Sequence, residues 1–84
     1  MLFRSQADQG HLADAVRFLG MAVSMEPNNA QHLFNMAIVE DRAGKKDDAI
    51  KYYQQALETD AVYGDSHSVP REQIYDRLSI LRQQ

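Results

Sequence analysis

The chain has 84 residues, enough for one small domain or for a piece of a larger one. Its 44% hydrophobic and 25% charged residues are ordinary for a globular protein, and no apolar run approaches the roughly 20 residues that cross a bilayer. A net charge of −3 argues against a nucleic-acid partner, and the absence of cysteine removes disulfides and thiolate chemistry. The missing cysteines fit a reducing cytosol without fixing the compartment.

The first part of the chain has the apolar spacing of a helix that ends before Pro27. One stripe at steps of three and four contains Leu12, Ala15, Val16, Leu19, Ala22 and Val23. A second helix is predicted from the spacing that starts at Leu33. Asn28 or Asn29 is its expected N-cap, because a short polar side chain can accept a hydrogen bond from a free backbone N–H.

Gly44 is placed where this second helix should end in a left-handed residue. A third helix then follows after a short turn, and its apolar residues are Ala49, Ile50, Tyr53, Ala56 and Leu57. Asp47 and Asp48 favour its start, because negative charge is stabilised at a helix N-terminus. Such a short turn leaves two helices antiparallel and in contact.

The last part of the chain begins with a loop over residues 63–69, after which Pro70 suits the first turn of a helix over residues 71–84. The apolar stripe of this helix is Ile74, Leu78 and Leu81. Its water-facing residues are expected to be Glu72, Gln73, Asp76, Arg77, Gln83 and Gln84. No alternating strand pattern occurs, so an all-α fold is predicted.

The chain also repeats itself after 34 residues. The matching pairs are Gly10 with Gly44, Asp14 with Asp48, Ala15 with Ala49 and Ala22 with Ala56. A helix–turn–helix unit of this period is the tetratricopeptide signature. The segment over residues 30–60 resembles one complete tetratricopeptide repeat on Leu33, Met36, Ala37, Gly44, Ala49, Tyr53, Ala56 and Leu57.

The resemblance implies antiparallel helix pairs stacked as a solenoid fragment. Residues 1–64 would hold the repeats, partial over residues 1–29 and full over residues 30–63, and residues 65–84 would hold a loop and a C-terminal capping helix. The matched alanines would let two helices cross closely. Two positions depart from the family pattern: Glu40 replaces a tyrosine and Ala61 replaces the closing proline, so the third helix can extend toward Tyr63.

The resemblance also implies a non-catalytic module that binds a protein or peptide partner, because the first helix of each pair lines the concave surface in this family. The expected partner-binding residues are Gln31, Phe34, Asn35, Ile38, Arg42 and Arg77, with Asp41 on the same face. Phe34 and Ile38 are four residues apart and would form one apolar patch, unless a neighbouring helix covers it. A carboxylate clamp of the kind that binds chaperone C-termini is less favoured, because Arg4 stands where such a clamp has asparagine.

The N-terminal end leaves two explanations open. Leu2 and Phe3 would begin partway through a repeat. The chain is then a piece of a longer repeat protein, a module that forms a homodimer through these residues, or both. Self-association is therefore the alternative function.

Catalysis is not expected. None of His11, His32 and His67 has a partner at a metal-ligand spacing, and no glycine-rich phosphate loop occurs, so no metal or cofactor is predicted. Adjacent Asp65, Ser66 and His67 suit a turn better than a catalytic triad, whose members are usually brought together from separate elements.

Overall fold

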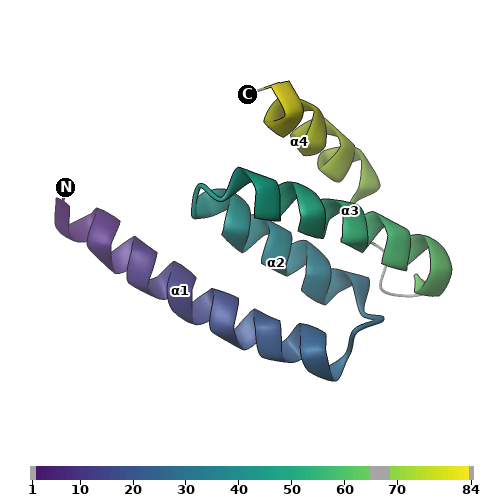
Figure 1. The fold of residues 1–84 in the computed structure, drawn as a ribbon, viewed down its shortest axis with the longest axis horizontal. Coiled ribbons are helices and arrows are strands. Elements are labelled where there is room, and N and C mark those ends of the chain that lie inside the picture. The colour runs from purple at the N-terminus through teal and green to yellow at the C-terminus, as the bar shows by residue number, and fades with distance from the viewer. Residues whose placement is uncertain (1, 65–68, 84) are drawn as a thin grey trace.

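The structure is a computed structural model that describes residues 2–64 and 69–83, with side chains from Gly10 onward. Within these ranges it contains four α-helices and no strand: α1 (Leu2–Met25), α2 (Ala30–Arg42), α3 (Lys46–Tyr63) and α4 (Arg71–Gln83). The helices follow one another in space as they do in the sequence, with α1 packed on α2, α2 on α3 and α3 on α4 (Figure 1). The predicted all-α fold is confirmed.

The first helix differs from the pattern of its repeat partner. Gly44 has a φ of +80° and ends a helix, whereas Gly10 lies inside the continuous helix α1 without a positive φ. A turn at Gly10 would be stabilised only if the preceding residues folded back as a helix against α1. Helix α1 instead runs without interruption from Leu2 through Gly10 to Met25.

The turn from α1 to α2 is stabilised by the second of the two expected caps. Asn29 is the N-cap, and its Oδ1 atom accepts hydrogen bonds from the backbone N–H groups of Gln31 and His32 at 3.0 and 3.4 Å. On the other side of the turn, His32 Nε2 lies 2.8 Å from Glu26 Oε1. These contacts fix the direction in which α2 leaves α1.

The turn from α2 to α3 is a Schellman motif. The N–H of Gly44 donates to the carbonyl of Asp41 at 3.1 Å, and the N–H of Lys45 donates to the carbonyl of Glu40 at 3.0 Å. Gly44 takes the left-handed conformation that this motif requires and that a side chain would disfavour. The expected helix end is therefore confirmed, and α2 and α3 are antiparallel.

The end of α3 is held by its last turn and by α4. The helix continues through Ala61 to Tyr63, as expected, and the N–H of Gly64 donates to Asp60 O at 2.8 Å. A side chain at residue 64 would collide with this carbonyl oxygen. Asp60 also accepts Arg71 Nη2 on its Oδ2 atom at 2.7 Å, which ties the start of α4 to α3. Pro70 lies just before α4 and accepts its first hydrogen bond.

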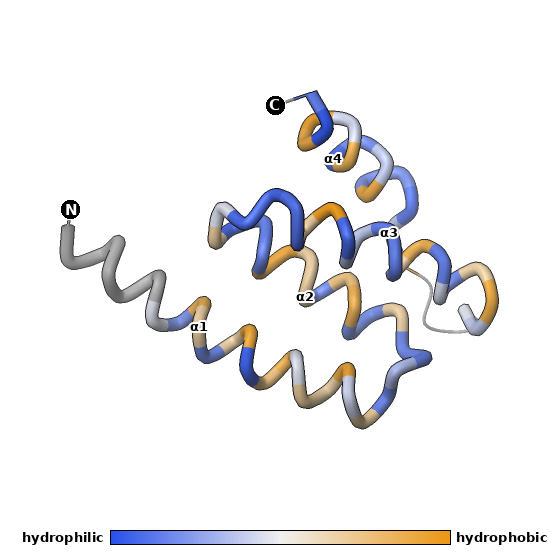
Figure 2. The backbone as a smooth tube through the Cα atoms, viewed as in Figure 1, coloured by the Kyte–Doolittle hydropathy of each residue, from blue (hydrophilic) through white to orange (hydrophobic). Residues whose placement is uncertain are grey.

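The core lies between α2, α3 and α4. Its buried hydrophobic residues are Ala30, Leu33, Met36, Ala37, Ala49, Tyr53, Ala56, Val69, Ile74, Leu78 and Leu81. Apolar positions recur along every helix in the hydropathy view (Figure 2), but none of the described side chains of α1 is fully buried. Ala49 and Ala56 have no exposed area, whereas their counterparts Ala15 and Ala22 are half-buried. The close helix crossing expected from the alanines is therefore tight only in the second unit.

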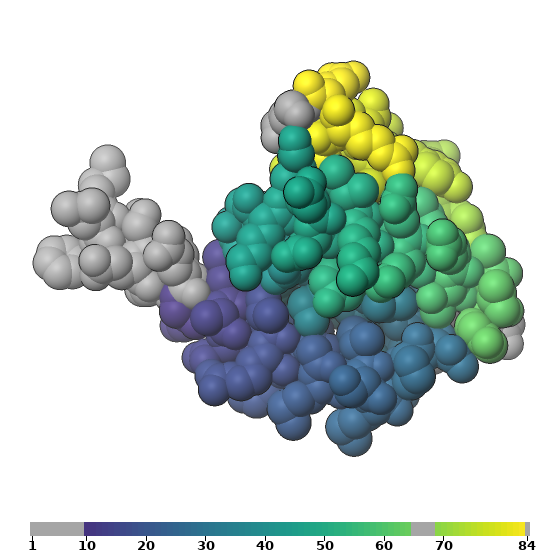
Figure 3. All heavy atoms as spheres, viewed as in Figure 1, coloured from purple at the N-terminus to yellow at the C-terminus, as the bar shows by residue number. Residues whose placement is uncertain are grey.

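Helix α4 covers α3 with the stripe predicted for it, since Ile74, Leu78 and Leu81 are all buried. The space-filling view shows α4 lying over α3 at one side of the molecule, with α1 at the opposite side (Figure 3). One residue of the expected water-facing set behaves differently. Arg77 is half-buried because its side chain reaches past α3 to a carboxylate of α2.

Candidate functional site

A small groove opens between α2 and α4, with α3 as its floor, and we call it the α2/α4 groove. Its volume is about 220 Å³, and it is lined by Phe34, Ile38, Tyr53, Gln73 and Arg77. The rings of Phe34 and Tyr53 are tilted by 51° with their centroids 6.3 Å apart, within the range of favourable aromatic pairs. The groove therefore combines aromatic and aliphatic side chains of α2 and α3 with an amide and a cation of α4.

A carboxylate of α2 joins the three helices around this groove. Asp41 accepts two hydrogen bonds from Arg77 of α4, from Nε at 2.5 Å and from Nη2 at 2.7 Å. It also accepts the hydroxyl of Tyr53 of α3 at 3.0 Å. A bidentate pair of this kind fixes the guanidinium plane as well as its position. The wall that α4 contributes to the groove is therefore held in one orientation.

These contacts shift the titration of the groups that make them. Hydrogen bonds from Arg77 hold the pKa of Asp41 below its ordinary value, although burial opposes them. Burial and, next, the hydrogen bond to Asp41 raise the pKa of Tyr53 to about 12. Asp41 consequently stabilises the fold above the ordinary pKa of an aspartate, and this contribution is lost as the pH falls through its lowered value.

The structure brings together three of the residues expected to bind a partner, namely Phe34, Ile38 and Arg77. Gln31 and Asn35 are exposed on the same helix but do not line the groove. The remaining expected residue is Arg42, which lies at the other side of α2 and lines pockets shared with α1.

Other predictions fall on residues that the structure does not cover fully. Leu2 and Phe3 begin α1, but their side chains lie outside the described part, as does the side chain of Arg4. The segment over residues 65–68 and Gln84 lie outside it altogether.

Two groove residues, Tyr53 and Gln73, were not among the expected partner-binding residues. Tyr53 was expected among the apolar residues of the third helix, and only 4% of it is exposed. Its hydroxyl nevertheless reaches the rim of the groove at Asp41. The sequence could have indicated that this hydroxyl has a hydrogen-bond partner, because a buried tyrosine usually has one. No local spacing relates either residue to Asp41, which is on a different helix.

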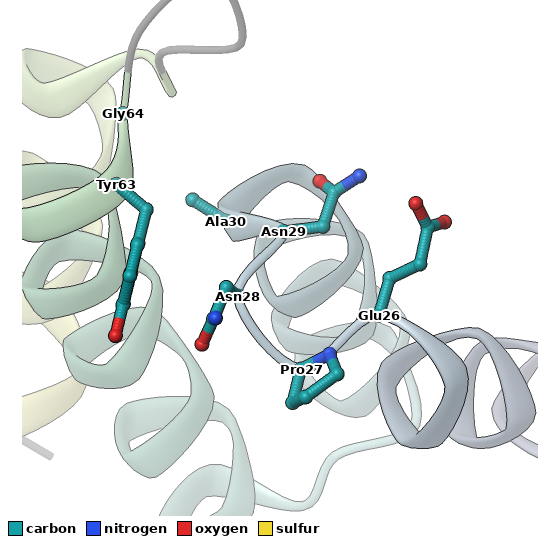
Figure 4. Close-up of a pocket in the computed structure, with 7 residues that line it drawn as sticks. All are labelled: Glu26, Pro27, Asn28, Asn29, Ala30, Tyr63 and Gly64. Carbon is teal, nitrogen blue, oxygen red and sulfur yellow. The ribbon is translucent and has the colours of Figure 1, made fainter.

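A second pocket, of about 300 Å³, lies where the turn from α1 to α2 meets the end of α3 (Figure 4). Tyr63 and Asn28 flank the gap, while the side chains of Glu26 and Asn29 point away from it. Both side chains already make hydrogen bonds: Glu26 pairs with His32, and Asn29 caps α2. The pocket therefore offers few free polar groups to a ligand.

A third pocket, of about 360 Å³, lies between α1 and the α2–α3 turn, and Glu40 lines it. Only 4% of this residue is exposed. Its Oε1 atom is shielded from solvent and accepts no hydrogen bond. Burial raises the pKa of Glu40 above its ordinary value, Asp48 adds to the effect, and Lys45 opposes it.

Glu40→Gln is expected to raise the melting temperature at pH 7, because the neutral amide needs no buried charge and can donate to Asp48. A raised carboxyl pKa means that Glu40 favours the fold below the ordinary pKa of a glutamate, and that this contribution is lost as the pH rises through the raised pKa of the folded state. The difference between variant and wild type should therefore shrink as the pH is lowered from 7 toward 4. Thermal melts over this range measure it, and a difference that grows toward low pH would contradict the assignment.

The described residues contain no group of three or more histidine, cysteine, aspartate or glutamate side chains placed to hold a metal ion. None of the helices over residues 2–64 and 69–83 is long and apolar enough to span a membrane. No protein-family model, curated protein or solved structure was found to match this chain.

Proposed function

We propose that the chain is a tetratricopeptide-type helical-repeat module that binds a peptide or helix of a partner protein in the α2/α4 groove. The observation that carries this proposal is the groove itself, in which Phe34 and Ile38 remain partly accessible between two helices that Arg77 and Asp41 hold together. An apolar floor with a few polar groups at its rim is typical of peptide-binding surfaces.

The repeat interpretation is supported by the pair α2 and α3. Its loop is short, its two central alanines are fully buried, and a following helix covers its apolar face. The first unit follows the pattern less closely, because α1 continues through Gly10. The proposal therefore rests on one complete helix pair with its neighbours.

The size of the groove favours a side chain over a free small molecule. At about 220 Å³ it is smaller than the roughly 300–1,000 Å³ of ordinary small-molecule sites. One apolar side chain of a partner would lie against Phe34 and Ile38, and Gln73 would offer hydrogen bonds to the partner's backbone. Because the guanidinium of Arg77 is already paired with Asp41, it would act mainly as a fixed wall.

A peptide library displayed on phage tests the proposal without a known partner. Peptides selected on the wild-type chain are expected to lose at least about tenfold in affinity for Phe34→Ala, since an apolar contact of about 1.4 kcal/mol corresponds to that factor. Gln73→Ala changes an exposed groove residue and should weaken binding without disturbing the core. Isothermal titration measures both effects.

The control for this experiment is Tyr75→Ala, because Tyr75 is 54% exposed on the same helix as Gln73 and does not line the groove. Peptides whose binding responds to Tyr75→Ala but not to Phe34→Ala and Gln73→Ala would place the interaction elsewhere. The same set of variants can be used to capture the natural partner from a lysate of the source organism.

Self-association is the second candidate, and one feature of α1 favours it. Phe18, Met21 and Met25 follow helical spacing on one face and are 68%, 57% and 79% exposed. An uncovered apolar face on a terminal helix is a common contact between copies of a protein. Self-association would make the melting temperature depend on protein concentration, whereas a peptide-binding monomer lacks this dependence.

A further inference from the structure

Helix α4 is attached to the core mainly through α3. Its buried residues Ile74, Leu78 and Leu81 belong to the hydrophobic core, and its backbone lies close to that of α3. Within the described helices, no Cα atom of α4 lies within 8 Å of a Cα atom of α2. The two walls of the α2/α4 groove therefore have no close backbone contact, and its width depends on side chains that cross it.

Two arginines of α4 form ion pairs with aspartates of the preceding helices. Arg71, at the start of α4, pairs with Asp60 of α3 at 2.7 Å. Arg77, less than two turns further along, pairs with Asp41 of α2 through two hydrogen bonds. Of the ion pairs between described residues, the second alone joins α2 to α4.

The carboxylate of Asp41 is itself held in place. Its side chain is 11% exposed, and both of its oxygen atoms accept hydrogen bonds. One of these bonds comes from the hydroxyl of Tyr53 on α3 at 3.0 Å. A carboxylate anchored in this way can fix the plane of a guanidinium group, because the two hydrogen bonds between them are nearly parallel. The position of Asp41 is thereby transmitted through Arg77 to α4.

We propose that Asp41 is the positioning residue that sets the width of the α2/α4 groove: through Arg77 it holds α4 in a closed position, and the groove widens when this link is lost. Only the consequence for binding rests on the proposed function. A partner that fits the closed groove would bind more weakly when the closed form is less populated, because its apparent dissociation constant rises in proportion.

The charge of Asp41 controls this link. Arg77 of α4 and Tyr53 of α3 act on the carboxylate directly, and Arg42, next to it on α2, acts on Tyr53. Hydrogen bonds from Arg77 lower the pKa of Asp41, so the link is present above the ordinary pKa of an aspartate and is lost as the pH falls through the lowered value. The pKa of Tyr53 is raised to about 12, so this residue stays neutral over the same range.

Distances between two spin labels test the proposal, and the absence of cysteine makes specific labelling simple. Gln31→Cys on α2 and Ser79→Cys on α4 place the labels at exposed positions that do not line the groove. In this labelled chain, Asp41→Asn is expected to shift the distance distribution at pH 7 to longer values and to broaden it. The neutral amide lacks the charge that holds Arg77.

Asp60→Asn is the matched control, because it makes the same chemical change at the aspartate that pairs with the other arginine of α4, outside the groove. It should leave the distance between the labels unchanged. A pH titration in the Asp60→Asn background then isolates Asp41: the distance should lengthen as the pH falls through the pKa of Asp41. Adding Asp41→Asn should remove this dependence on pH.

The peptides selected on the wild-type chain give a second measurement. Asp41→Asn should weaken their binding at least about tenfold, the factor by which one charge-assisted hydrogen bond changes an equilibrium, whereas Asp60→Asn should not. The inference is overturned if Asp41→Asn leaves the label distance unchanged, or if Asp60→Asn lengthens it as much. A longer distance with unchanged peptide binding would instead contradict the proposed function, because the groove would have opened without effect on the ligand.

Discussion

Ile74→Ala is expected to lower the free energy of unfolding by about 2–5 kcal/mol, the range measured when a large buried aliphatic side chain is truncated. Ile74 has no exposed area and is the first residue of the stripe that covers α3. The truncation would leave a cavity between α3 and α4 that their backbones can close only in part. Chemical denaturation followed by circular dichroism measures the change.

The same helix provides the control. Ile80→Ala removes the same atoms from a residue that is 46% exposed, so its effect should be clearly smaller. Equal losses for the two variants would mean that α4 does not pack on α3 through the observed face. Because Gln73 and Arg77 flank Ile74 on α4, weakened packing of this helix should also weaken binding in the α2/α4 groove.

Ala49→Leu is expected to cost about 1–3 kcal/mol through overpacking of the crossing between α2 and α3. The methyl group of Ala49 is fully buried, and the short loop at Gly44 prevents the two helices from separating at this end. The larger side chain would therefore force either helix or both away from the contact. A lower melting temperature with unchanged helix content is the expected result.

Ala61→Leu is the appropriate comparison, because Ala61 is exposed on the same helix. Leucine and alanine are both good helix formers, so this substitution should change the stability little. A melting temperature for Ala49→Leu that equals that of the wild type would show that the alanine does not set the distance between the helices. The repeat interpretation would lose its main physical support.

The substitutions at Ala49 and Ile74 test two different helix–helix contacts of the core. Ala49 reports on the contact within one helix pair, whereas Ile74 reports on the contact between that pair and the helix that follows. The buried core between α2, α3 and α4 contains both kinds of contact, so each substitution should destabilise the domain as a whole.

The local features of the fold were predictable from the residues themselves. Asn29 was one of two expected caps for α2, Gly44 was expected to adopt a left-handed conformation, and the stripe of α4 was expected to face the core. Each of these depends on interactions within about one or two helical turns. They follow from hydrogen-bonding capacity, backbone freedom and helical periodicity, which act wherever the segment is placed.

The candidate site was predictable only in part. Phe34 and Ile38 were identified because they are neighbours on one helix face, which spacing alone reveals. Arg77 was expected in the groove, but its pairing with Asp41 joins residues that are 36 positions apart. Tyr53 completes that cluster from a third helix. No pattern within a segment encodes which side chains three separate helices bring to one point.

The sequence by itself determined that this protein is helical, where α2 begins and ends, and which face of α4 is buried, because short-range contacts decide these features. Tertiary structure alone decided that α1 continues through Gly10, that Glu40 is buried without a hydrogen bond on one oxygen, and that Asp41 joins three helices. The physical reason is that packing and desolvation depend on what surrounds a residue in space. Those surroundings exist only after the helices have been assembled.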